Sequence, residues 1–338
     1  MPGNISQDMK TVGLIFTRKK IERSGFIGLE DYALKRNLRV IHIDLNMPIE
    51  EQGELDLVVH KMTDLVAKIE RGDKEAARLY QRFIDYSKRH PEVIVIDTWP
   101  NIEKVLDRML LYHHTKTCAA RDTIEGDPLF YVPKSIALDS IRNWGNNIDI
   151  KFPAMCKRRT ACSSTEAHQM TLIPSERGML QLQKYYGDED SVILQEFIQH
   201  DGVIVKVYVA DGQITASTRP SFKNLDQTGD VVHFDSQTLP KHFETKNELS
   251  DGLDRVFLRS DPDDIHLHKE ALLDMDRLQM IADSLYHQLG LTFFGFDVLL
   301  QAQTNAYYVV DVNYFPSFKN VDNFHSMFVD ILKRRLAH

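Results

Sequence analysis

The chain has 338 residues, and its composition of 43% hydrophobic and 27% charged residues is that of a globular protein. This length predicts two or three packed lobes rather than one core. The net charge is −8, from 41 lysines and arginines against 49 aspartates and glutamates, which argues against nucleic-acid binding because that function needs a basic face.

The apolar runs and the cysteines of the sequence indicate the cellular location to expect. No apolar run reaches the roughly 20 residues that span a bilayer, and the first ten residues lack the apolar stretch of a signal peptide. The three cysteines have neither the close spacing of a zinc site nor the even count of a disulfide framework. We therefore expect a protein of the cytoplasm, with the nucleus as the alternative, that binds neither nucleic acid nor membrane. A monomer is the default expectation.

The first hundred residues alternate between apolar runs and polar segments. Strands are predicted at 11–17, 39–45, 55–60 and 92–97, and helices at 22–36 and 73–89. This alternation predicts a mostly parallel sheet, whose ligands collect at the carboxyl ends of the strands. Lys20 and Lys61 follow two such ends, so we expect them to bind a compact anion. Solvated surface is the alternative for basic clusters such as 18–20 and 157–159.

The middle of the chain predicts a mixture of helices and strands. A helix that begins after Pro100 carries Arg108, and a strand at 153–157 leads into a polar loop. Further strands are predicted at 191–198, 203–209 and 213–218, joined by turns at 200–202 and 211–212. Residues 223–262 predict a long surface excursion, 264–289 an amphipathic helix ended by Gly290, and 322–336 a final helix.

A hairpin of unusual composition is predicted near the C-terminus. The apolar runs 291–300 and 306–313 predict its two strands, and a turn centred between them places Asp297 opposite Asp311. Asn313 lies on the same face as Asp311 because side chains alternate along a strand. Three oxygen-bearing side chains therefore converge within apolar strands.

Two carboxylates that close together repel each other, so a shared proton or a cation must compensate. A hard divalent cation is the better choice, and oxygen ligands without histidine or cysteine favour Mg²⁺ over zinc. The alternative is that the polar residues merely end a strand.

Two further segments suit a nucleotide. Lys157 ends a strand and precedes a polar loop and His168, where a lysine and loop amides can hold phosphates. The extended segment 195–198 suits an adenine edge, although ordinary edge strands have the same pattern.

From about residue 11 to about residue 335, many short motifs match one family in a single order. They are Lys19-Lys20, Arg39-Val40, Pro48 to Gly53, Leu55-Asp56, His60-Lys61, His90-Pro91, Leu106 to Arg108, Cys156-Lys157, His168, Gln195, Phe197-Ile198, Lys206-Val207, Arg219 to Ser221, Lys223-Asn224, Phe294-Gly295, Asp297, Asp311 to Asn313 and Phe315-Pro316. On these motifs the chain resembles the inositol 3,4,5,6-tetrakisphosphate 1-kinases, also called inositol 1,3,4-trisphosphate 5/6-kinases.

The resemblance implies an α/β (α+β) ATP-grasp fold in three parts. These are an N-terminal α/β domain on the inositol-phosphate side at 1–107, a central ATP-grasp lobe at 108–194, and a C-terminal ATP-grasp lobe with a magnesium site at 195–338. The implied activity is transfer of the ATP γ-phosphate to a hydroxyl of inositol tris- or tetrakisphosphates, with Mg²⁺ as cofactor. The enzyme would act as a 1-kinase on the 3,4,5,6-tetrakisphosphate and as a 5/6-kinase on the 1,3,4-trisphosphate.

The resemblance also implies a role for each matching residue. The magnesium ligands are Asp297, Asp311 and Asn313, the set that the hairpin also predicts. The ATP contacts are Arg108, Lys157, Gln195, Glu196, Phe197, Ile198, Ser221 and Ser236. The inositol-phosphate contacts are Lys20, Lys61, His168, Lys206, Asn313 and Ser317. Lys206 and Arg219 are the expected catalytic residues because they add positive charge near the transferred phosphate, and no general base is assigned.

Two departures from the family pattern leave alternatives open. Relatives often carry Ala-His-Gly-Thr over the phosphates, whereas residues 161–165 are Ala-Cys-Ser-Ser-Thr, without the glycine that lets backbone approach phosphate closely. Ser317 stands where many relatives have glycine. The alternatives are an ATP-grasp carboxylate–amine ligase, which needs fewer basic residues around its substrate, and a weakly active inositol-phosphate-binding protein, which the altered loop would suit.

Overall fold

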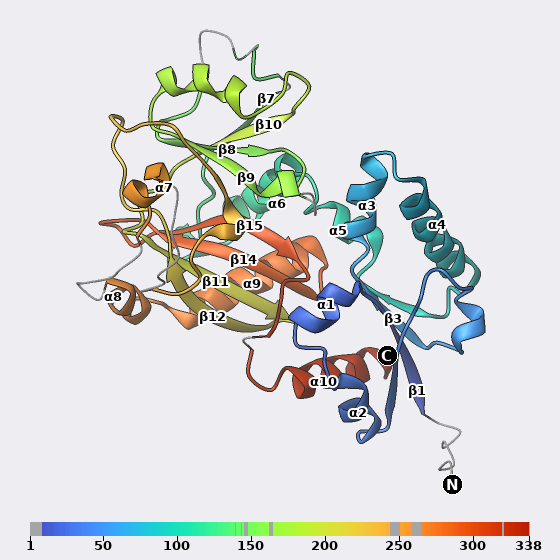
Figure 1. Ribbon diagram of the computed structural model, residues 1–338. Helices are drawn as coiled ribbons and strands as arrows, with labels where there is room; N and C mark the ends of the chain where they lie inside the picture. The colour runs from blue at the N-terminus through green and yellow to red at the C-terminus, as the bar shows by residue number, and fades with distance from the viewer. Residues whose placement is uncertain are drawn as a thin grey trace. The chain divides into compact units, whose positions relative to one another are not determined.

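The structure is a computed structural model that describes residues 9–138, 140–142, 144, 148–161, 165–243, 251–258, 265–319 and 321–337 (Figure 1). Their packing forms two compact units. The first unit comprises residues up to Pro100 together with 291–293 and 315–338, and the second comprises 101–290 and 294–314. The three-part division at 107 and 194 stays a prediction.

The first unit is built on a parallel sheet with strand order β2-β1-β3-β4. Its strands are β1 (Lys10–Ile15), β2 (Leu38–His42), β3 (Leu57–His60) and β4 (Ile94–Ile96). Its helices are α1 (Arg18–Arg23), α2 (Leu29–Leu34), η1 (Glu50–Gln52), α3 (Thr63–Glu70), α4 (Lys74–Arg89) and α10 (Phe324–Leu336), and α5 (Trp99–Glu103) crosses into the second unit. The predicted parallel sheet is therefore confirmed.

The single helix predicted at 22–36 is wrong. Two short helices, α1 and α2, occupy this region because Gly25 and Gly28 adopt φ of 91° and 81°, which helical residues do not. The sequence patterns also missed α3, which begins at Thr63, two residues after Lys61.

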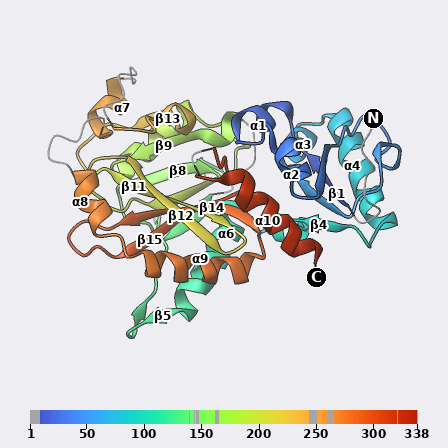
Figure 2. The same ribbon diagram turned by 90° about the horizontal axis from the view of Figure 1, so that it is seen from below.

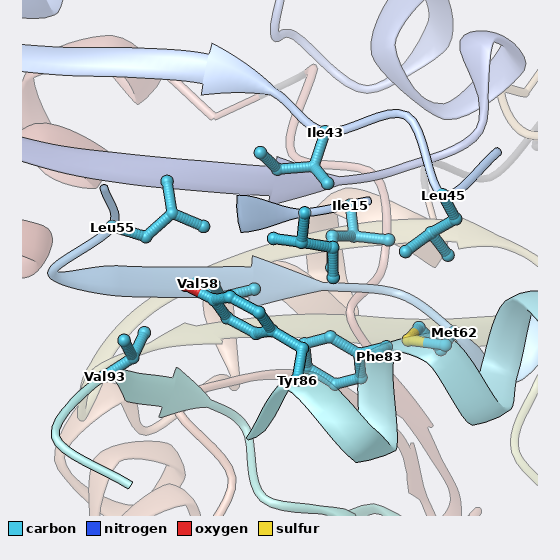
Figure 3. Packing of buried hydrophobic residues seen from close by; sticks show 10 residues of the cluster. Ile15, Ile43, Leu45, Leu55, Val58, Met62, Phe83, Tyr86 and Val93 are labelled. Atoms are coloured by element: carbon cyan, nitrogen blue, oxygen red, sulfur yellow. The ribbon is translucent and has the colours of Figure 1, made fainter. Parts of the chain in front are cut away.

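Helix α4 covers one face of this sheet (Figure 3). Phe83 and Tyr86 are three residues apart, so they lie on one side of the helix and pack with Val58 and Ile15. Each of these four side chains is at most 6% exposed. Burial of this apolar surface holds β1 and β3 in place, and Lys20 and Lys61 follow their carboxyl ends.

Aromatic rings join the end of the chain to the first unit. The ring of Phe328 on α10 lies 5.4 Å from that of Phe26 and 5.2 Å from that of Phe293, and the Phe293 and Phe315 rings are 5.0 Å apart. All four rings are fully buried. Helix α10 therefore packs against N-terminal elements, and the segment that begins at Phe315 belongs to the same unit as Lys20.

The described part of the second unit contains a five-stranded antiparallel sheet with strand order β13-β9-β8-β10-β7, a four-stranded sheet with strand order β12-β11-β14-β15, and the short antiparallel pair β5-β6 (Figure 2). Its strands are β5 (Thr123–Ile124), β6 (Asp127–Pro128), β7 (Ser135–Leu138), β8 (Ala154–Arg158), β9 (Gln169–Ile173), β10 (Val192–Glu196), β11 (Val203–Ala210), β12 (Gln213–Pro220), β13 (Val232–Asp235), β14 (Phe293–Leu300) and β15 (Tyr307–Tyr314). Its helices are α6 (Arg108–Arg121), η2 (Thr165–His168), η3 (Glu176–Lys184), η4 (Ser236–Thr238), α7 (Asp251–Val256), α8 (Ile265–Ala271) and α9 (Met275–Leu289).

The strands predicted at 191–198 and 203–209 are confirmed as β10 and β11, and they belong to different sheets, because β10 pairs with β7 and β8 while β11 pairs with β12. Two other expectations for this region need correction. The region 223–262 contains β13 and α7 besides residues outside the described ones, since apolar side chains such as Phe257 are buried there. The helix predicted at 264–289 is two helices, α8 and α9. The second begins at Met275, because the Asp274 side chain caps it by accepting from the Arg277 N–H.

The helix predicted to begin after Pro100 and to carry Arg108 is also wrong, because α5 ends at Glu103 and Arg108 begins a separate helix, α6, which Asp107 caps. Two further expectations for the second unit hold. Gly290 ends α9 with φ of 68°, and β11 and β12 form the predicted hairpin around Asp211-Gly212. No helix in the described parts of the chain combines the length and the apolar character needed to cross a bilayer.

Candidate active site

The pairing of β14 with β15 confirms the predicted register: Asp297 lies opposite Asp311, and Gly295 lies opposite Asn313. Beyond Asp297 the register shifts by one residue, so Leu299 pairs with Tyr308. Along β14, Asp297 and Leu299 therefore share one face as in a regular strand. Along β15 the bulge changes the alternation, so that Asp311 lies on the same face as Tyr308, three residues earlier. The structure therefore brings both carboxylates and the amide of Asn313 to one face of the second sheet.

Each carboxylate has its own cation. Lys206 on β11 forms an ion pair with Asp297, and Arg108 Nη1 lies 3.1 Å from Asp311 Oδ1. Asn313 Nδ2 also donates to Asp311 Oδ2 at 3.1 Å. Burial raises the pKa of Asp297 against the opposing effect of Lys206. Burial also acts to raise the pKa of Asp311, but Arg108 and the neighbouring lysines outweigh it and the net shift is downward.

Arg108 reaches Asp311 because of the way α6 begins. Asp107 caps the helix by accepting from the N–H groups of Met109 and Leu110, at 2.8 and 2.9 Å. This cap places Arg108 in the first turn, where Arg108 Nε donates to the Arg158 carbonyl at 3.1 Å. The guanidinium is buried and held from two sides, so it presents a fixed positive charge to the site.

Lys157 and Gln195 form a second polar pair, on the adjacent strands β8 and β10. Lys157 Nζ donates to Gln195 Oε1 at 2.7 Å, and both side chains are buried. Burial lowers the pKa of Lys157 to about 8, although the Asp311 charge opposes the shift. A cavity is lined by Lys157 and Gln195 together with Arg108, Asp311 and apolar residues of α6. Three of the predicted ATP residues, Arg108, Lys157 and Gln195, thus border the same space as Asp311, one of the predicted magnesium ligands.

Arg219 approaches the same carboxylates along the β11–β12 hairpin. Arg219 Nη2 donates to the Tyr208 hydroxyl at 2.6 Å, and its charge acts to lower the pKa of Asp297. The sequence analysis missed Tyr208. Its spacing of two residues from Lys206 was the available signal, because residues i and i+2 share a face of a strand.

The hinge segment 195–198 leaves the sheet at Glu196. The N–H groups of Glu196 and Phe197 donate to the carbonyls of Lys134 and Pro153 at 2.9 and 3.0 Å. Within the described residues, the Ile198 N–H has no hydrogen-bond partner. Of this segment, Gln195 lines the cavity.

The remaining ATP-side and substrate-side predictions fall at two places in the second unit. Gln169 on β9 pairs with Asp235 on β13. His168 directly precedes Gln169 and Ser236 directly follows Asp235, so both lie at the same end of the β9–β13 pair. Ser221 is buried, and its hydroxyl contacts His200, a residue the sequence analysis did not single out. The glycine-free loop falls largely on residues 162–164, outside the described residues.

The first unit gathers the predicted substrate lysines around one turn. Lys20 Nζ donates to the carbonyls of Phe315 and Pro316, each at 2.8 Å, and Lys61 Nζ donates to the Phe315 carbonyl at 3.2 Å. Burial and the Lys61 charge lower the pKa of Lys20 to about 6, against the opposing charge of Asp64. Ser317 follows this turn, so the structure brings Lys20, Lys61 and the segment 315–317 together.

Two domain models of one protein family match most of the chain. Residues 11–102 match the inositol 1,3,4-trisphosphate 5/6-kinase pre-ATP-grasp domain, and residues 121–334 match the ATP-grasp domain of the same kinases. The chain belongs to the inositol 1,3,4-trisphosphate 5/6-kinase family. The predicted fold class is confirmed with it, and the kinase family decides against the ligase alternative.

Individual members of this family are similar over nearly the full chain. The inositol-tetrakisphosphate 1-kinase of Xenopus laevis is 30% identical over 331 residues, which are 96% of this chain and 77% of that protein. The one of Danio rerio is 28% identical over 321 residues, 93% of this chain and 76% of that protein. A RimK domain ATP-grasp protein from Sphaerobacter thermophilus has a similar fold, with a TM-score of 0.56 at 14% identity, over 96% of this chain and 99% of that one.

Proposed function

We propose that this member of the inositol 1,3,4-trisphosphate 5/6-kinase family transfers the γ-phosphate of ATP to a ring hydroxyl of inositol tris- and tetrakisphosphates. Family membership identifies the chain as an ATP-dependent inositol phosphate kinase. The observation that supports the proposed site is the facing pair Asp297 and Asp311, each with its own cation, of which Asp311 lines a cavity together with Lys157 and Gln195. The acceptors, a 3,4,5,6-tetrakisphosphate and a 1,3,4-trisphosphate, are taken from the resemblance.

The set Asp297, Asp311 and Asn313 fits Mg²⁺. Its donors are two carboxylates and one amide oxygen, and Mg²⁺ is held by one or two carboxylates with water and phosphate completing its shell. When bound, the ion supplies positive charge that offsets the charge developing on the transferred phosphate. The cations beside both aspartates favour the ionised carboxylates that such a site requires.

The chain's own cations serve the triphosphate. Lys157 and Arg108 bind phosphate oxygens, with Arg108 also orienting Asp311. Lys206 and Arg219 stabilise the charge that grows on the transferred group, which is the main requirement of phosphoryl transfer. The hinge residues Gln195, Glu196, Phe197 and Ile198 hold the base, and Ser221 and Ser236 complete the ATP contacts. No residue needs to act as a general base.

We assign the inositol phosphate to six residues. They are Lys20, Lys61, His168, Lys206, Asn313 and Ser317. The basic side chains of this set attract a polyanion, and Lys20 and Lys61 already hold the Phe315 carbonyl, an oxygen acceptor, as they would a phosphate oxygen. We further propose a monomer that works in the cytoplasm or nucleus.

One assay tests the proposal as a whole. The protein is incubated with ATP, Mg²⁺ and a panel of inositol tris- to hexakisphosphates, and the products are resolved by isomer. Production of ADP together with a new inositol phosphate supports the proposal. Binding of inositol phosphates without turnover would instead identify a weakly active binding protein.

Lys20→Ala is expected to raise the KM for the inositol phosphate about tenfold or more, because a charge-assisted hydrogen bond to a phosphate is lost. The KM for ATP should change by less than about twofold, since Lys20 belongs to the first unit and the ATP residues to the second. Lys19→Ala is the matched control, because Lys19 is the exposed neighbour on the same helix. An unchanged KM for the inositol phosphate in Lys20→Ala would contradict the assignment.

Binding of the inositol phosphate is expected to draw a proton onto Lys20. With its pKa lowered to about 6, Lys20 is mostly neutral in the free protein above that pH, and a nearby polyanion favours the charged form. The uptake should therefore be largest above about pH 6 and fade below it, where Lys20 is already protonated.

Calorimetric titration in buffers of different ionisation enthalpy measures this uptake. The phosphates themselves exchange protons, so the informative quantity is the difference between the wild type and Lys20→Met. Equal proton exchange in the two proteins would rule out Lys20 as the titrating group.

A further inference from the structure

The segment that follows the hinge is held more tightly than a loop between two sheets requires. It runs from Phe197 to Gly202, between the end of β10 in one sheet and the start of β11 in the other. Gln199 exchanges two hydrogen bonds with the backbone of Leu225, at 2.6 and 2.7 Å. Asn224 Oδ1 accepts from the N–H groups of His200 and Asp201, both at 2.9 Å. Residues 199–201, which follow the hinge, are thus held by hydrogen bonds to Asn224 and Leu225, which follow β12.

The ring of His200 lies at the centre of this arrangement. The side chain is buried, with Nδ1 2.6 Å from the Ile198 carbonyl and Nε2 2.8 Å from the Ser221 hydroxyl. Its two partners lie on opposite sides of the imidazole, one in the hinge and one directly after β12. The ring therefore connects a predicted base-binding residue with a predicted ATP-contacting serine.

The chemistry of the partners assigns a direction to both bonds. A carbonyl oxygen only accepts, so His200 Nδ1 carries a hydrogen and donates to Ile198. Burial lowers the pKa of His200 to about 4, although Ile198 and Asp201 oppose the shift, so the ring is neutral at physiological pH. Neutral imidazole has one donor nitrogen, which leaves Nε2 as the acceptor of the Ser221 hydroxyl hydrogen.

These directions have consequences for the nucleotide. The Ile198 carbonyl is committed to His200, while the N–H of the same residue stays available to a ligand. The Ser221 hydrogen is committed as well, so its oxygen can only accept from a ligand, as from a sugar hydroxyl, and cannot donate to a phosphate. Because the ring holds the Ile198 carbonyl, the backbone of this segment is already ordered before the nucleotide binds. Binding of the base then costs less conformational entropy.

We propose that His200 is a positioning residue for the nucleotide: it holds the Ile198 carbonyl, fixes the hinge for the base, and makes Ser221 an acceptor. This inference rests on the proposed ATP site. His200 does not touch the nucleotide itself, and its effect passes through Ile198 and Ser221.

Binding of ADP with Mg²⁺, measured by calorimetry, and the KM values for ATP and inositol phosphate test the inference. His200→Ala removes both bonds and is expected to weaken ADP binding and raise the KM for ATP about tenfold, as for the loss of a buried hydrogen bond that orders a site. His200→Asn keeps a donor near the position of Nδ1 and should recover most of this loss. The KM for inositol phosphate should stay within about twofold in both variants.

Ser221→Ala and the double variant Ser221→Ala with His200→Ala test the connection between the two residues. Coupled residues give a combined effect on ADP binding smaller than the product of the single effects. His325→Asn is the control for the loss of a partly buried histidine, because His325 Nε2 likewise contacts a backbone carbonyl, that of Gly25 at 2.9 Å, but belongs to the first unit. It should leave ADP binding unchanged.

Three results would overturn the inference. These are wild-type ADP binding in folded His200→Ala, no recovery in His200→Asn, or fully multiplicative effects of His200 and Ser221. If His200→Ala does not fold, His200→Asn, Ser221→Ala and their combination still decide between coupled and independent roles. Failure of the wild-type protein to bind ADP would contradict the proposed function instead, so the two failures are distinguishable.

Discussion

Asp297→Asn is expected to lower kcat by at least about a hundredfold, because it removes one of the two carboxylates that would hold the metal ion at the transferred phosphate. Asparagine has nearly the same shape, so the fold should survive. The substitution also leaves Lys206 without its ion-pair partner, which turns a positioned cation into a mobile one. Steady-state turnover at saturating ATP and inositol phosphate, over a titration of Mg²⁺, measures the effect.

Asp311→Asn provides an independent check of the same site. If both carboxylates bind one ion, the two variants should both require more Mg²⁺ than the wild type and lose turnover to a similar extent. Asp283→Asn is the control, since Asp283 is an exposed carboxylate on α9 that accepts a hydrogen bond from Gln279 on the same helix. Wild-type turnover of Asp297→Asn in excess Mg²⁺ would refute the metal assignment.

Lys157→Met is expected to raise the KM for ATP, and the dissociation constant of ADP, about tenfold or more. Methionine replaces the length of the side chain but not its charge, so the phosphates lose a cation at the cavity and Gln195 loses its donor. The thermal midpoint should not fall, because Lys157 is buried beside Arg108 and its charge is costly to desolvate.

The combination of weaker binding with undiminished stability distinguishes a ligand-binding lysine from a structural one. Lys184→Met, at an exposed lysine of the same unit, should change neither quantity. A lower thermal midpoint with unchanged ADP binding would show that Lys157 stabilises the sheet rather than the nucleotide.

The register of the acidic hairpin was predictable from the sequence, whereas the extent of one helix and the sheet membership of two strands were not. Asp297 and Asp311 were predicted to face each other, and they do, because a short turn leaves few possible registers for a hairpin. The helix predicted at 22–36 was wrong, because its apolar spacing continues through two glycines whose backbone angles interrupt it. The strands on either side of His200 were predicted, but not the sheet that each joins, since spacing alone does not show which sheet a strand belongs to.

Some contacts of the site had no signal in the sequence. Tyr208 could have been found from its spacing to Lys206, but nothing near His200 indicated its two hydrogen bonds. One of its partners is 21 residues away in the chain. Periodicity describes which face of an element a side chain occupies, and it is silent on what packs against that face.

The sequence by itself determined the acidic hairpin, the basic residues at strand ends and the family, since these depend on local pairing and on ordered motifs. Only the tertiary structure decided which cation serves which carboxylate. Arg108 meets Asp311 across 203 residues of chain and Lys206 meets Asp297 across 91, through the cap of α6 and the pairing of β11 with β14. Tertiary packing also joined residues 315–337 to the N-terminal unit, because six aromatic rings from both ends of the chain are buried only together.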